Sequence, residues 1–228
     1  MLLRLRISLP DRPGALGQVT RALGTIGADI HQVTVLGREG GRAVDDFTVA
    51  WPVSADGPEA GRNEPVCAHM RDRLAGLPGV SVEGVWITRV VPGAAPGYDL
   101  LRYVAAEPVR AYTTLVDALP DLVGADWAVT VATGPGAAGR PRAWSRLVHR
   151  SVRAPADFSP AGEVPPRAGV SSDGDVRLLC VPVQDAGLCL IVGRHQGAEF
   201  HPAELDSVVR LVEVVAMLAP AGEATAVG

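Results

Sequence analysis

The stretch Asp11-Arg12-Pro13-Gly14 places an acid, a proline and a glycine where a strand is expected to end and a helix to begin. Proline in the first turn of a helix gives up an amide donor that has no intrahelical partner there. Gly14 leaves the backbone open to close approach by another molecule. Because free amides at a helix N-terminus favour a carboxylate, the stretch predicts a carboxylate-binding site. The alternative is local: Asp11 caps the helix, while Pro13 and Gly14 only shape the turn.

Two other groups of reactive side chains are expected to be structural. His195, Glu199 and His201 lie close together in RHQGAEFH, but their spacing matches no known set of metal ligands, which favours a solvated loop. Cys180 and Cys189 fall on adjacent strands of a predicted hairpin. Their diagonal separation of about 7–8 Å is too long for an unstrained disulfide. We therefore expect both cysteines in a core.

The segment RPRAWSRLVHRSVR, residues 140–153, is the one locally basic run. We expect a helix there, with its arginines on a solvated face opposite Leu147 and Val148, in preference to a site for an anionic partner. Motifs of serine hydrolases, phosphate-binding loops, zinc proteases and dinucleotide-binding folds do not occur in the sequence. The sequence thus predicts no catalytic residues, no metal site and no cofactor.

Composition limits the class of protein. The chain has 228 residues, 47% of them hydrophobic, which is enough for one large or two small packed domains. Its net charge of −4 argues against a general nucleic-acid binder. No apolar run approaches the ~20 residues that span a bilayer, and the apolar N-terminus is interrupted by Arg4 and Arg6. We expect a soluble, cytoplasmic protein that contacts neither membrane nor nucleic acid.

The first ninety residues alternate between strand and helix periodicities. Apolar residues recur at every second position in the strands and on one face of the helices. The order β-α-β-β-α-β predicts a ferredoxin-like sandwich, with two helices on one face of a four-stranded antiparallel sheet. The expected strands cover 2–9, 28–37, 42–51 and 80–90, and the helices 13–27 and 66–77.

A Pro- and Gly-rich linker at 91–97 separates this domain, 1–90, from a second one at 98–220. The second is predicted to be an α/β domain with a central antiparallel sheet, so the whole chain is α+β. Its expected elements are a helix at 98–119 broken near Pro108, a strand at 126–132, loops at 133–141 and 154–174, a hairpin of 176–183 with 188–194, and a helix at 202–218.

Residues 3–90 resemble an ACT domain, the small regulatory module found on many enzymes of amino-acid metabolism. The resemblance rests on LPDRPGALGQVTRAL, GADIHQVTV and GRAVDDFTV, in this order within the βαββαβ pattern. It implies that two such domains pair side by side and bind a free amino acid at their interface. The contacts it implies come from the loop after the first strand and from the start of the second strand. The residues are Asp11, Arg12, Pro13, Gly14, Ala15 and Leu16, with Ala28, Asp29, Ile30 and His31. The helix amides suit the ligand carboxylate, and Asp29 is expected to meet its ammonium group.

Residues 176–218 resemble the end of a GAF domain. The resemblance rests on LLCVPV, LIVGR and AEFHPAELDSVVRLVEVVA, where Phe200, Pro202 and Glu204 fit the F-x-P-x-E opening of the terminal helix. Two features depart from the family: His201 stands where Ser or Thr is the better cap, and the middle, 133–174, is short and proline-rich. Ligand pockets of GAF-like domains depend on that middle.

The terminal helix is apolar nearly all round, which predicts burial on more than one side. We therefore expect a homodimer in which this helix and helix 98–119 of two copies form a four-helix interface. One apolar face holds Leu205, Val208, Val209, Val212, Val215 and Ala216, and the excess flank holds Leu211, Val214 and Leu218.

Together these features predict a non-catalytic regulatory protein. Its expected partners are a free amino acid or similar small metabolite, a second copy of the chain, and an unidentified protein. Two alternatives stay open: a ligand-free assembly module, and an enzyme with an unrecognised site in the C-terminal domain.

Overall fold

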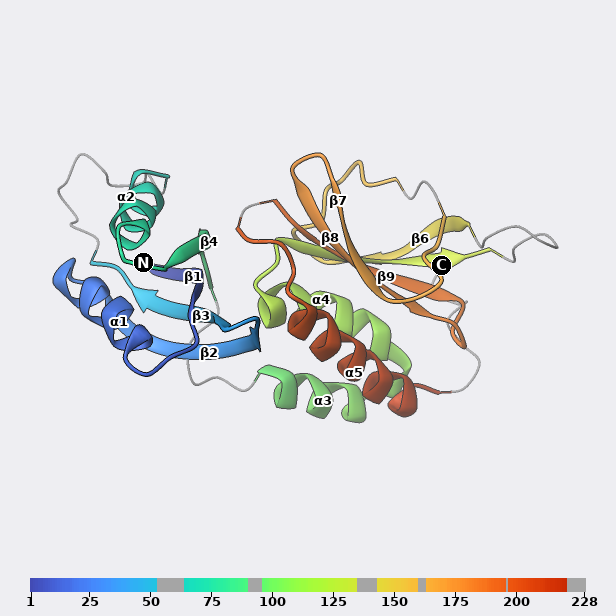
Figure 1. Cartoon of the computed structure of the whole chain (residues 1–228). Coiled ribbons are helices and arrows are strands. Elements are labelled where there is room, and N and C mark those ends of the chain that lie inside the picture. Colours follow the sequence, from blue (N-terminus) through green and yellow to red (C-terminus); the bar gives the residue numbers. More distant parts are fainter. Residues whose placement is uncertain (53–63, 90–95, 135–142, 160–162, 196, 221–228) are drawn as a thin grey trace. The chain divides into compact units, whose positions relative to one another are not determined.

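The structure is a computed structural model that describes residues 1–52, 64–89, 96–134, 143–159, 163–195 and 197–220 (Figure 1). The chain divides into two compact units. One is Met1–Ala94 with Gln196–Glu199, and the other is Ala95–His195 with Phe200–Gly228. Most of the predicted linker at 91–97 lies outside the described residues. Both units combine helices with an antiparallel sheet, which confirms the α+β class.

The first unit has the predicted β-α-β-β-α-β order, and its strands pair in the order β2-β3-β1-β4. Gly40 and Gly41, with φ of 57° and 73°, form the β2–β3 turn, where only glycine adopts such angles at no steric cost. The elements are β1 Leu2–Pro10, α1 Ala15–Thr25, β2 Asp29–Glu39, β3 Arg42–Ala50, α2 Glu64–Ala75 and β4 Ser81–Ile87.

Strand alternation places the apolar residues of β1 on one face of this sheet. Leu3, Leu5 and Ile7 are fully buried and belong to the same core cluster as Val19 of α1 and Met70 of α2. Each buried side chain of this size contributes about 1.5–3 kcal/mol. The helices therefore cover the face to which the odd-numbered residues of β1 point.

The opposite face carries a buried charge cluster. Arg6 donates from Nε to Asp46 Oδ1 at 2.8 Å and from Nη2 to Oδ2 at 2.8 Å, a two-pronged pair. Arg4 adds Nη2 to Oδ2 at 2.7 Å. Both guanidinium groups lie within 6 Å of the Trp86 ring centre, at 5.8 and 5.7 Å. Two cations thus neutralise Asp46 on the side of the sheet away from the helices.

The second unit is a five-stranded antiparallel sheet in the order β6-β5-β9-β8-β7, and three helices pack on one of its faces (Figure 1). The other face packs against residues of the segment between β6 and β7. The helices are α3 Pro96–Ala106, the 3-10 turn η1 Pro108–Arg110, α4 Ala111–Val123 and α5 Pro202–Leu218. The strands are β5 Trp127–Thr133, β6 Trp144–Arg150, β7 Gly169–Asp173, β8 Val176–Val183 and β9 Leu188–Arg194.

The predicted break at Pro108, the hairpin and the terminal helix are confirmed. Val183 pairs with Leu188 and Cys180 with Ile191, as expected. Cys180 and Cys189 are buried and form no disulfide. Burial raises the pKa of the Cys180 thiol to about 11. The two cysteines are therefore core residues with little thiolate character.

Two predictions for this unit are wrong. The basic run is not helical: its described part contains the strand β6, which pairs with β5, while residues 140–142 lie outside the described residues. An edge strand tolerates arginines because its outer side faces water, so the charges do not require a helix. The expected loop at 154–174 ends in the short strand β7, whose polar residues pair with β8.

The excess apolar flank of α5 is partly covered within its own unit. Leu211 packs against the core cluster formed with α3 and α4, and Val214 is half-buried. Among the last residues of the helix, Met217 and Leu218 are 76% and 38% exposed. Both α3 and α4 pack against α5, which covers more of this flank than the helical pattern alone predicts. The homodimer stays a prediction.

The F-x-P-x-E stretch fixes the start of α5. The Arg194 guanidinium lies 4.1 Å above the Phe200 ring centre and donates to Glu204 Oε1 at 2.9 Å and to the Val123 carbonyl at 2.7 Å. Glu204 accepts from the His201 amide at 2.8 Å, and His201 Nδ1 accepts from the Ala203 amide at 3.2 Å. Histidine is therefore a working cap here, in a capping box with Glu204. Within the described residues, no helix is long and apolar enough to cross a membrane.

We predict that Glu204→Ala lowers the free energy of unfolding by about 3–5 kcal/mol, because it removes the acidic partner of a buried arginine. The matched control is Glu213→Ala, on the exposed side of the same helix, with an expected change within about 0.5 kcal/mol. Urea denaturation followed by circular dichroism measures both. Equal losses in the two variants would contradict the assigned role of the buried pair.

Candidate functional site

The loop between β1 and α1 keeps the start of α1 accessible. Gly14 is the N-cap residue of α1 with φ of 87°, and no side chain caps the helix there. A Cβ atom placed on Gly14 would meet nothing within 4 Å, so the space beside it is open. The Ala15 amide donates to the Arg12 carbonyl at 3.2 Å, whereas the Leu16 and Gly17 amides have no partner among the described residues and remain available to an anion. The local interpretation, in which Asp11 caps the helix, does not match this geometry.

Asp11 instead turns toward the sheet. Its amide donates to the Gly41 carbonyl at 2.9 Å, and its carboxylate lies 3.8 Å from Nε of Arg38 in β2. Arg38 is more than half exposed and pairs across the sheet with Ala43, which places it on the helix-covered face. Arg38 is absent from the residues predicted for the site. It brings a cation to the end of the sheet at which α1 begins.

The second predicted segment, Ala28–His31, lies at the other end of the sheet. Asp29 pairs with Ala50 of β3, whereas Pro10, just before the loop, pairs with Arg42. These partners are eight residues apart on one strand, or about 26 Å at ~3.3 Å per residue. Asp29 is 83% exposed and lies 3.5 Å from Nε2 of His31. One chain therefore does not bring the two predicted halves of the site together.

Asp45 is a second polar residue, besides Arg38, that is absent from the predicted site. It belongs to β3, opposite Ile7 of β1 and Val35 of β2, on the face that α1 and α2 cover. Only 3% of the residue is exposed, and its Oδ1 has no hydrogen-bond partner. The sequence held a signal for it, since Asp45 occupies the register of the core residues Phe47 and Val49.

The charge state of Asp45 follows from its surroundings. Burial raises the pKa of the Asp45 carboxyl above its ordinary value of 3.8. Asp11 and Asp46 raise this pKa further, while Arg38 lowers it. Each of these effects acts on the charged form: burial and like charges disfavour the carboxylate, and a nearby cation favours it. A buried carboxylate next to Asp11 and Arg38 is therefore short of positive charge.

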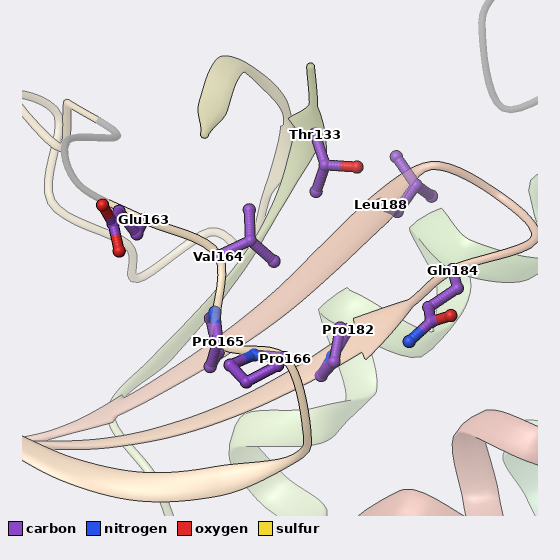
Figure 2. A pocket seen from close by; sticks show the side chains of 8 residues that line it. All are labelled: Thr133, Glu163, Val164, Pro165, Pro166, Pro182, Gln184 and Leu188. Carbon is purple, nitrogen blue, oxygen red and sulfur yellow. The ribbon is translucent and has the colours of Figure 1, made fainter. Parts of the chain in front are cut away.

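The second unit contains a separate cavity of about 620 Å³ at the β8–β9 hairpin (Figure 2). Three prolines in its wall offer no amide donors. Its polar groups are a carboxylate, a hydroxyl and a carboxamide, with no cation among the lining residues. Such a wall is mostly apolar and does not favour an anion. The lining residues are Thr133, Glu163, Val164, Pro165, Pro166, Pro182, Gln184 and Leu188.

The remaining reactive residues have structural contacts. The His149 ring lies 3.0 Å from Asp117, and Arg153 donates to Asp121 at 2.8 Å, so part of the basic run pairs with α4. His195 lies 3.5 Å from Asp126. His201 caps α5. These pairs are partly exposed, and each is worth at most about 1 kcal/mol.

We predict that Asp45→Asn stabilises the protein at pH 7 and has no such effect near pH 3. A carboxyl whose pKa is raised in the folded state keeps a proton that the unfolded chain has already lost. Stability therefore falls as the pH rises from about 3.8 through the folded-state pKa. Asparagine does not titrate and escapes this loss.

The matched control is the neighbouring residue on the other face. Asp46→Asn removes the carboxylate that pairs with Arg4 and Arg6, and we expect a loss of about 3–5 kcal/mol at pH 7. Thermal unfolding between pH 3 and pH 8 measures both variants. A loss of stability at pH 7 in Asp45→Asn would show that its carboxylate is already paired.

No protein-family model matches the sequence, and no curated protein matches it significantly. Among solved structures, the chain is similar to a formyltetrahydrofolate deformylase from Pseudomonas putida KT2440, at 20% identity and a TM-score of 0.28. That match covers 46% of this chain and 38% of the deformylase. The chain is also similar to an unknown protein from Galdieria sulphuraria, at 12% identity and a TM-score of 0.29. That match covers 95% of this chain and 91% of the other. The chain thus spans well under half the length of the deformylase that it matches.

Proposed function

We propose that the chain is a non-catalytic regulatory protein of the cytoplasm, in which an ACT-type first unit senses a free amino acid and a GAF-like second unit passes the signal to an unidentified protein. The observation that carries this proposal is the accessible start of α1 at Gly14, with Arg38 beside the same loop. Free amides and a guanidinium group together suit a carboxylate ligand.

Pairing of two chains through β2 would complete the site. β2 is an edge strand, and it exposes the apolar residues Val33 and Val35. An exposed apolar edge invites pairing with another strand. Antiparallel pairing of two copies about a two-fold axis at Thr34, the middle residue of Asp29–Glu39, sets the start of one β2 beside the end of the other. The Ala28–His31 segment of one copy then lies next to the α1 loop of its partner.

This arrangement accounts for a site whose halves lie at opposite ends of one sheet. It also supports the expected homodimer through a different surface from α5, whose apolar flank is partly covered. A ligand-free assembly module would pair through the same edge, so ligand binding has to be tested separately from pairing.

We predict that at least one of the twenty amino acids raises the melting temperature of the protein. A ligand that binds only the folded state at 100 times its Kd stabilises it by about 2.7 kcal/mol. A thermal-shift screen measures this directly. A dimer that responds to none of the twenty would favour the assembly module and contradict amino-acid sensing.

We predict a dimer in light scattering coupled to size exclusion at micromolar concentration. Thr34→Glu would place two carboxylates opposite each other at the proposed axis, which is destabilising. This variant should run as a monomer and lose the thermal shift. Thr25→Glu adds the same charge at an exposed position of α1 and should keep both properties. A monomeric wild-type protein would contradict the pairing.

A further inference from the structure

Asp45 lies three residues along β3 from Arg42, or about 10 Å from the end of the sheet at which α1 begins. Its neighbours across the sheet are Ile7 and Val35, and Arg38 pairs with Ala43, two residues further along the same face of β3. Asp11 and Arg38, which lie 3.8 Å apart, both act electrostatically on Asp45. The buried carboxyl, the basic side chain and the α1 loop therefore belong to one region.

A buried polar atom without a partner is costly in a folded protein, by about 1–3 kcal/mol and more when it is charged. Oδ1 of Asp45 is such an atom. Asp46, the next residue, has two arginines bonded to its carboxylate. Asp45 has no corresponding cation hydrogen-bonded to Oδ1, although Arg38 is near enough to lower its pKa. What would satisfy Asp45 is a small cationic hydrogen-bond donor that enters from outside the chain.

We infer that Asp45 binds the ammonium group of the ligand, while the α1 amides and Arg38 bind its carboxylate. This inference rests on the proposed function, and it assigns the ligand to the primary amino acids as opposed to carboxylic acids without an amine. It also moves the ammonium contact away from Asp29, whose side chain is 83% exposed and lies 3.5 Å from Nε2 of His31.

The effect of an asparagine substitution on ligand affinity distinguishes this role from a structural one. A carboxyl that stays protonated in the core gains nothing from a cation and is replaced by asparagine without effect on binding. A carboxylate that meets an ammonium group loses a charge-assisted hydrogen bond in the same replacement. The affinity for the carboxylate end of the ligand is unchanged in both cases.

The test uses the full chain with three sets of probes: the twenty amino acids, their matched carboxylic acids without the amino group, and their matched primary amines. Calorimetry gives the Kd of each probe that produces a thermal shift. We expect the wild-type protein to prefer the amino acid over its des-amino acid by roughly 10- to 100-fold. Asp45→Asn should weaken amino-acid binding by the same factor and leave the des-amino acid unchanged.

Two control variants assign the two ends of the ligand. Arg38→Gln should weaken the amino acid and the des-amino acid equally, and Asp29→Asn should preserve the preference for the amino acid. Circular dichroism and the melting temperature confirm that each variant is folded. The preference of the wild-type protein for the amino acid is measured without any variant. Equal binding of the amino acid and its des-amino acid therefore overturns the inference even if Asp45→Asn does not fold.

The outcomes separate the inference from the proposed function. If an amino acid binds but Asp45→Asn keeps the preference, or Asp29→Asn abolishes it, the inference is wrong and amino-acid sensing stands. If only primary amines bind, and Asp45→Asn abolishes their binding, the cation site stands and amino-acid sensing fails. If no probe binds, both are wrong.

Discussion

Consecutive side chains of a strand leave a sheet on opposite faces, and in β3 this rule sets two adjacent aspartates in opposite environments. Asp46 points to the face where Arg4 and Arg6 neutralise it, and Asp45 points to the face that the helices cover. A shift of one residue in the pairing of β3 would exchange the two. The register therefore decides which carboxylate is paired with arginines and which has an oxygen without a hydrogen-bond partner.

The second unit also buries a charged side chain, but it satisfies that charge in a different way. Its buried arginine, Arg194, has an acidic partner and a helix C-terminus to bond, because β9, α4 and α5 meet at that point. The acidic partner, Glu204, also closes the capping box of α5. One short stretch of sequence thus fixes the start of a helix and satisfies a buried charge.

Sequence alone predicted most of the fold of the first unit, because the alternation of Leu3, Leu5 and Ile7 and the paired glycines at 40 and 41 each determine local structure. It failed at β6 and β7, where polar residues are frequent because the strands lie on the sheet edges. Edge position is a property of the tertiary structure, and a polar edge strand resembles a helix face or a loop when only the sequence is considered.

The candidate site was predictable only in part, for a related reason. The α1 loop was predictable from Pro13 and Gly14, because proline and glycine act on the conformation of the backbone next to them. Arg38 belongs to the same region only because a register shift near Gly37 returns it to the helix-covered face. Asp45 was visible as a polar residue in a core register, but its lack of a partner depends on what α1 and β2 place around it. Local chemistry was therefore predictable, and contacts across strands were not.

The separation of Asp29 from the α1 loop by the length of the sheet has a thermodynamic consequence. In the proposed dimer, a pocket assembled from opposite ends of two identical chains would exist in duplicate or not at all, so ligand binding and subunit association would be coupled equilibria. Dilution would then lower the apparent affinity for the ligand, and the ligand would tighten the association of the chains by the same free energy. The concentration of the chain in the cell would then help to set the metabolite concentration to which it responds.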